Sequence, residues 1–200
     1  ILASNDLDEK TILNLRMQGA KIDAWGVGTK LITAFDQPAL GAVYKLVSIA
    51  DPSGKMIDTL KISSNANKVT TPGKKQVWRI QADTIKKNEG DWISMAHEDP
   101  RRLEALYMFH PDHPYINKVV TNFSARPLLK TIFKDGQLVY NDPDVIQIKR
   151  MVTDRLDGLW DEYKRTLNPQ EYPVDLSQEL YDHKFQLISK IRDKIRESEH

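Results

Sequence analysis

The feature that most limits how this chain can fold is a short run, residues 20–25, that ends at a glycine-rich turn. Polar and apolar side chains alternate in the run, which predicts a strand entering a core. Gly26 and Gly28 carry no Cβ atom, so the backbone can adopt positive φ angles and a ligand can approach it closely. Thr29 adds a hydroxyl group where we expect a helix over 30–33. Because amides at a helix N-terminus bind anions, the turn is a candidate phosphate site, and a tight turn without a ligand is the alternative.

A second polar loop strengthens the phosphate interpretation. Residues 1–4 have the character of the end of a buried strand, and Ser4, Asn5 and Asp6 follow it. Asn5 or Asp6 can cap the next helix, and Gly19 is expected to end that helix. Residues 1–25 thus predict a β-α-β unit. Since ligands bind where loops leave the carboxyl ends of parallel strands, we expect both polar loops on one rim of the sheet.

Composition excludes several classes of protein. The 200 residues include 29 basic and 28 acidic side chains, a formal net charge of +1, so no overall field attracts nucleic acid. The absence of cysteine excludes disulfides and thiolate metal sites and agrees with a reducing compartment. No apolar run approaches the length that spans a membrane, and we expect no signal peptide. The chain starts without methionine, inside the expected strand, so we expect it to be a piece of a longer protein.

Several runs of residues resemble the nicotinate phosphoribosyltransferases. The similarity extends over almost the whole chain and is carried by SNDLDE (4–9), QGAKID (18–23), WGVGT (25–29), DQPALGAVYKL (36–46), PGKKQV (72–77) and YPVDLS (172–177). The resemblance implies the carboxyl-terminal part, less than half, of an enzyme of NAD biosynthesis and salvage. That enzyme joins nicotinate to phosphoribosyl pyrophosphate, giving nicotinate mononucleotide, with coupled ATP hydrolysis and magnesium.

The resemblance also implies the fold and the site. It indicates the α/β class: the C-terminal strands of an irregular phosphoribosyltransferase α/β barrel, followed by a β-rich segment and two C-terminal helices. It implies a cytoplasmic enzyme that is a homodimer at full length. Catalytic and nicotinate-contacting residues lie upstream, so we assign no catalytic residue and no metal ligand here and expect the chain alone to be inactive. The residues matching the family's phosphate-binding loops are Gly26, Gly28 and Thr29, with Ser4, Asn5 and Asp6 on the adjoining loop.

The pattern predicts three segments: 1–41 as an α/β portion, which the resemblance implies is the end of the barrel, 42–140 as β-rich, and 141–200 as helical. In the middle segment we expect a hairpin of strands 42–50 and 56–62 and further strands at 76–81 and around Trp92. Residues 101–108 fit a helix or a strand. Asp135-Gly136 indicates a type I′ hairpin turn between 128–133 and 137–140.

Two helices are expected at the end of the chain. Asn141 or Asp142 is predicted to cap the first, with Pro143 at its first position, and Asp175 to cap the last. Each has an apolar stripe that we expect to pack against the rest of the fold.

Two polar stretches allow other interpretations. Residues 63–75, with Lys61 nearby, are basic: a solvated loop is favoured over a nucleic-acid arm, and lysines approaching the ligand's phosphates are the third alternative. His110 and His113 have the spacing of metal ligands on a helix, but the neighbouring prolines exclude that helix, and we expect a surface turn. For the whole chain, the alternative to an enzyme part is a non-catalytic phosphate- or nucleotide-binding regulatory module. The charge balance and the scattered aromatic residues disfavour an RNA-binding module.

Overall fold

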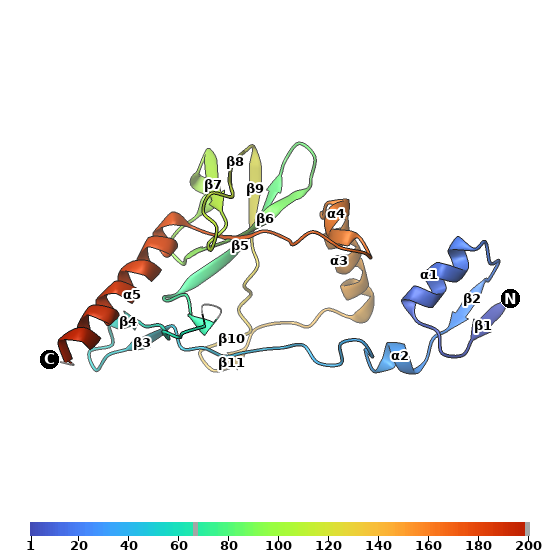
Figure 1. Ribbon diagram of the computed structural model, residues 1–200, viewed down its shortest axis with the longest axis horizontal. Coiled ribbons are helices and arrows are strands. Elements are labelled where there is room, and N and C mark those ends of the chain that lie inside the picture. Colours follow the sequence, from blue (N-terminus) through green and yellow to red (C-terminus); the bar gives the residue numbers. More distant parts are fainter. Residues whose placement is uncertain (66–67, 199–200) are drawn as a thin grey trace. The chain divides into compact units, whose positions relative to one another are not determined.

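The computed structural model describes residues 1–65 and 68–198, which fall into two compact units, Ile1–Tyr44 and Lys45–His200 (Figure 1). The sequence predicts three segments. Residues 45–200 form one unit, in which a strand from the expected helical segment, Val174–Leu176, joins the sheet of the expected β-rich segment.

The first unit is the expected β-α-β arrangement. Strand β1 (Leu2–Ser4) leads to helix α1 (Glu9–Met17), and strand β2 (Ala24–Gly26) returns parallel to β1. The register places Ser4 opposite Gly26, so both strands end at the same edge. Helix α2 (Thr29–Ile32) follows directly, one residue earlier than the sequence predicts.

The cap of α1 differs from the prediction. Asp8 is the N-cap, and its carboxylate accepts a hydrogen bond of 2.7 Å from the Thr11 amide. Asn5 and Asp6 are not caps, because they occupy the left-handed region with φ angles of 87° and 47° and turn the chain between β1 and the cap. Gly19, with φ 83°, ends the helix as predicted.

The first unit has little core of its own. Among residues 1–44, all of which the structure describes, Leu7 is the only buried side chain. The sheet has two short strands, and a two-stranded sheet is marginally stable without a packed face.

Hydrogen exchange on the chain should therefore separate the two units. Amides of β1 and β2 are expected to exchange about a hundredfold faster than those in the centre of the large sheet, a difference of ~3 kcal/mol in opening free energy. Exchange detected by mass spectrometry measures this directly. Equal protection in both units would contradict it.

The second unit is built on a mixed six-stranded sheet in the order β8-β7-β12-β6-β5-β9. Strand β12 lies parallel to β6 and antiparallel to β7. The strands are β5 (Lys75–Ala82), β6 (Asn88–Met95), β7 (Ala105–Phe109), β8 (Asn117–Thr121), β9 (Phe123–Pro127) and β12 (Val174–Leu176). The strands predicted at 76–81 and around Trp92 are confirmed. The undecided stretch 101–108 is a 3₁₀ turn, η2 (Pro100–Arg102), followed by β7.

Alternation along β5 separates the two faces of this sheet. Trp78 and Ile80 point into the hydrophobic core, which also contains Trp92, Leu106, Met108 and Val120. Arg79 and Gln81 lie between them in sequence and therefore face the opposite side. One face is thus apolar and buried, and the other carries polar side chains.

Two hairpins lie outside this sheet. Strands β3 (Ser48–Ala50) and β4 (Met56–Asp58) form the first, and both are shorter than the predicted 42–50 and 56–62. Strands β10 (Phe133–Lys134) and β11 (Gln137–Leu138) form the second. Its turn residues, Asp135 and Gly136, both have positive φ angles, 51° and 77°, which confirms the predicted type I′ turn.

Helix α3 (Val145–Asp157) starts later than predicted. Asp144 is its N-cap and forms a capping box with Gln147, so neither Asn141 nor Asp142 has that role. Gly158 is the C-cap of α3, and a short helix α4 (Asp161–Lys164) follows. Within α3 itself no side chain of the predicted apolar stripe is fully buried. Met151 and, beyond the helix, Leu159, Trp160 and Tyr163 are half-buried, and the Trp160 indole donates to the Asn88 carbonyl oxygen of the sheet. Periodicity identifies the stripe but not what covers it.

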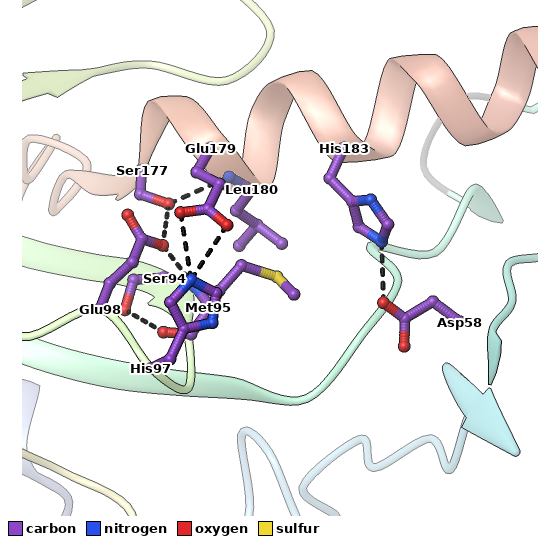
Figure 2. A network of polar contacts seen from close by, with 9 residues as sticks. All are labelled: Asp58, Ser94, Met95, His97, Glu98, Ser177, Glu179, Leu180 and His183. Carbon is purple, nitrogen blue, oxygen red and sulfur yellow. Dashed lines mark hydrogen bonds and ion pairs between the residues drawn. The ribbon is translucent and has the colours of Figure 1, made fainter. Parts of the chain in front are cut away.

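The last helix, α5 (Gln178–Ser198), is anchored at its first turn (Figure 2). Asp175 does not cap it, because Asp175 lies in β12. Ser177 is the cap: its hydroxyl accepts the Leu180 amide at 3.1 Å and donates to Glu98 at 2.7 Å. Leu180 is fully buried beneath.

A second polar contact ties α5 to the first hairpin. Figure 2 shows His183 directed toward Asp58 of β4, with 2.8 Å between Nε2 and Oδ2.

Within residues 1–65 and 68–198, no helix has the length and apolar character needed to cross a bilayer.

The basic stretch 63–75 is not a fully solvated loop, because its last residue, Lys75, is the first residue of β5 and is partly buried. Lys75 donates to the carbonyl oxygens of Thr71, Pro72 and Gly73 at 2.7, 3.2 and 2.7 Å, and burial lowers the pKa of Lys75. This lysine therefore closes its own loop and is not free to bind a phosphate. Residues 66 and 67 lie outside the described residues.

The histidine pair forms the expected turn between β7 and β8. The His110 Nδ1 atom accepts the amides of Asp112 and His113, and the two histidine rings stack at 5.0 Å. Both histidines thus have a structural role in the turn.

Candidate phosphate-binding site

Five of the six predicted site residues line one cavity of about 180 Å³. They are Asn5, Asp6, Gly26, Gly28 and Thr29, and the lining is completed by Leu7 and Lys30. The parallel pairing of β1 and β2 produces this arrangement, because it places the two polar loops at the same edge. Ser4 is not in the lining and lies within β1, opposite Gly26.

The two glycines have different physical reasons to lack a side chain. A Cβ atom on Gly26 would lie 3.0 Å from the Cβ of Ser4, so Gly26 allows β1 and β2 to approach closely. A Cβ atom on Gly28 would meet no heavy atom within 4 Å. Packing within the chain therefore requires glycine at position 26. At position 28 a Cβ atom has open space, and this position lines the cavity.

The donors at this loop are backbone amides rather than a helix dipole. Gly28 is the N-cap of α2, and no side chain caps that end. Helix α2 has four residues, too few to build a substantial macrodipole. The Leu31 amide donates to the Gly28 carbonyl oxygen at 3.1 Å, whereas the amides of Thr29 and Lys30 have no acceptor within the described residues and remain available to an anion, with the Thr29 hydroxyl beside them.

Lys30 is the site residue that sequence reasoning missed. Its ammonium donates to the Asp8 carboxylate at 2.7 Å, and this bond holds the pKa of Asp8 well below its usual range and raises that of Lys30. The charge of Lys30 is thus partly neutralised, and Asp6 adds a carboxylate to the same lining. A basic side chain directly after Thr29, within the turn itself, is the sequence signal that could have identified it.

Within the described residues, no group of three or more histidine, aspartate or glutamate side chains is placed to hold a metal ion. Asp6 is the one predicted site residue with a carboxylate at the cavity. Magnesium is bound in proteins through one or two carboxylates together with substrate phosphates, so a preformed protein cage is not required for it.

A family model described as "Nicotinate phosphoribosyltransferase C-terminal domain" matches residues 74–184, more than half of the chain. The chain belongs to the nicotinate phosphoribosyltransferase family. It corresponds to the C-terminal part, as the sequence resemblance implies.

Relatives agree with this assignment. The nicotinate phosphoribosyltransferase of Bacillus subtilis is 54% identical over 98% of this chain, and that of Caenorhabditis elegans is 35% identical over 90%. The chain spans only 40% and 32% of the lengths of these relatives. The crystal structure of human nicotinic acid phosphoribosyltransferase matches 94% of the chain with a TM-score of 0.70 at 22% identity, which confirms the α/β fold.

The Lys45–His200 unit contains a buried acid with a shifted pKa. Asp175 of β12 pairs in register with Trp92 of β6 and is only 5% exposed. Burial raises the pKa of Asp175, and the positive charges of Lys118 and His110 partly offset this effect. Because the folded-state pKa lies above the ordinary 3.8, the folded protein binds this proton more tightly than the unfolded chain does.

Stability should therefore fall as pH rises from about 4 through the folded-state pKa of Asp175, and the loss persists above it. Asp175→Asn removes the buried charge and is expected to raise stability at pH 7 by on the order of 1 kcal/mol, about 2–4 °C in Tm. The gain should shrink steadily as pH falls toward 3.5, because the aspartate becomes protonated in the folded state and then in the unfolded state. Melting curves of both proteins between pH 3.5 and 8 test this, and a pH-independent difference would contradict it.

Proposed function

We propose that the chain is the phosphate-binding C-terminal part of an enzyme that joins nicotinate to phosphoribosyl pyrophosphate. The products are nicotinate mononucleotide and pyrophosphate, in NAD biosynthesis and salvage. Family membership and the names of the relatives support this activity. The observation that carries the role of this chain is the single cavity lined by Asn5, Asp6, Gly26, Gly28 and Thr29.

In this proposal the cavity holds the 5′-phosphate of phosphoribosyl pyrophosphate and of the product. The amides after Gly28 and the Thr29 hydroxyl donate to the phosphate oxygens, and charge-assisted bonds of this type are short and strong. The phosphate does not react. Its binding positions C1 of the ribose between nicotinate and the leaving pyrophosphate, so this loop contributes by orientation.

The remaining components belong to the complete enzyme. We propose that ATP is a further ligand, whose hydrolysis drives the coupled step, and that magnesium accompanies the substrate phosphates. Asp6 supplies the carboxylate of this cavity that could contact a magnesium ion bound mainly by the substrate phosphates. A cytoplasmic homodimer is proposed on the same family grounds.

The function is tested by assaying nicotinate mononucleotide formation from nicotinate and phosphoribosyl pyrophosphate. A protein that joins this chain to the rest of the enzyme is expected to form the product, and the chain alone is expected to form none. If the complete protein binds phosphoribosyl pyrophosphate but never forms product, the alternative of a regulatory phosphate-binding module is correct instead.

A further inference from the structure

A row of charged side chains crosses the polar face of the large sheet. In register, Arg79 of β5 lies opposite Arg126 of β9 on one side and Asp91 of β6 on the other. The Arg79 guanidinium forms two parallel bonds to Asp91, at 2.9 and 3.0 Å. Directly opposed like charges destabilise a sheet. Since Asp91 neutralises only Arg79, the charge of Arg126 remains uncompensated in this row.

A third guanidinium approaches from the helix that follows. Arg155 of α3 lines a cavity of about 290 Å³ together with Arg79 and Arg126; the other lining residues are Gln81, Asn88, Met151, Asp154 and Gly158. Neither Arg126 nor Arg155 forms an ion pair within the described parts of the chain. Three guanidinium groups thus share a cavity with one carboxylate, Asp154, because Asp91 is already held by Arg79.

A second cavity, of about 350 Å³, adjoins the first and shares Arg79 and Arg155 with it. Its other walls are mostly apolar or aromatic: Val152, Leu156, Leu159, Tyr163, Gln170 and Tyr172. The two tyrosine rings meet edge to face at 5.4 Å, and Tyr172 is fixed by a 3.2 Å hydrogen bond to Asp91. The arginine-lined first cavity therefore continues into a second cavity whose walls include two tyrosine rings.

We propose that these adjoining cavities form a binding site for a phosphate monoester that carries a planar ring. The phosphate lies beside Arg126 and Arg155, whose guanidinium groups suit bidentate recognition of phosphate oxygens, while Arg79 keeps its two bonds to Asp91. The ring lies against Tyr163 and Leu156. All of these residues belong to the Lys45–His200 unit, so the proposal does not depend on the role of the Gly28 loop.

Calorimetric titration of the complete protein with phenyl phosphate tests this site. Arg126→Gln and Arg155→Gln are each expected to weaken binding about tenfold, since each removes a charge-assisted contact. Arg150→Gln is the matched control: it makes the same charge change on α3, outside both cavity linings, and should change affinity less than twofold. Equal weakening by Arg150→Gln, or wild-type affinity in the other two variants, would overturn the proposal.

Two further comparisons separate the parts of the site. Leu156→Ala should weaken phenyl phosphate but not inorganic phosphate, because it alters only the wall against the ring. Gly28→Val should leave phenyl phosphate affinity unchanged, and loss of binding in that variant would place the ligand at the other loop.

Arg126→Gln should not lower Tm, because it relieves like-charge repulsion with Arg79. A lower Tm would mean that Arg126 is a structural residue.

Discussion

Gly28→Val is expected to raise the KM for phosphoribosyl pyrophosphate at least tenfold in the complete enzyme and to change kcat little. A Cβ atom at this position would meet no heavy atom within 4 Å, so packing within the chain does not require glycine here. The valine methyl groups would occupy the volume that we assign to the phosphate. Because the phosphate is bound alike in substrate, transition state and product, the loss falls on binding and not on the chemical step.

Two variants calibrate this result. Thr29→Ala removes one hydrogen bond to a charged group and should cost ~1.5–3 kcal/mol of substrate binding. Gly41→Val is the control, because Gly41 also has open space around its Cβ position but does not line the cavity. Steady-state kinetics measure all three. An unchanged KM in Gly28→Val would show that the loop is only a turn.

Asp91→Ala is expected to lower the free energy of unfolding by about 3–5 kcal/mol, the usual cost of removing one member of a buried ion pair. The Arg79 and Asp91 side chains are 22% and 12% exposed, so solvent screens this pair weakly. The variant leaves Arg79 facing Arg126 without a counter-charge. It also removes the acceptor of the Tyr172 hydroxyl.

Urea or guanidinium unfolding of the chain measures this effect. Asp83→Ala is the control, because the Asp83–Lys86 pair is exposed and 3.5 Å apart, and its loss should cost less than about 1 kcal/mol. Similar costs for the two variants would mean that the Arg79–Asp91 pair behaves as a surface pair.

Local signals in the sequence predict several elements and turns of both units. The β-α-β order, the helix end at Gly19 and the turn at Asp135-Gly136 each depend on a few neighbouring residues, and all three are confirmed. The capping predictions were less accurate. Several Asn and Asp residues precede α1 and α3, and only the backbone path decides which one reaches the amides.

Features that depend on strand pairing could not be read from the sequence. The separate roles of Gly26 and Gly28 depend on which of them faces Ser4 across the β1–β2 pair. Asp175 has the pattern of a helix cap, but pairing with β6 makes it a strand residue. The opposition of Arg79 and Arg126 likewise exists only in the register of β5 and β9, which no local pattern specifies.

The central claim, that the cavity at Gly28 holds the 5′-phosphate, is tested most directly by a binding cycle that removes the phosphate from the ligand. Dissociation constants would be measured for nicotinate mononucleotide and for its riboside, which lacks the 5′-phosphate, with the wild-type enzyme and with Gly28→Val. We predict that the substitution weakens the mononucleotide at least tenfold and leaves the riboside unchanged. Equal weakening of both ligands, or of neither, would contradict the assignment of the phosphate to this loop.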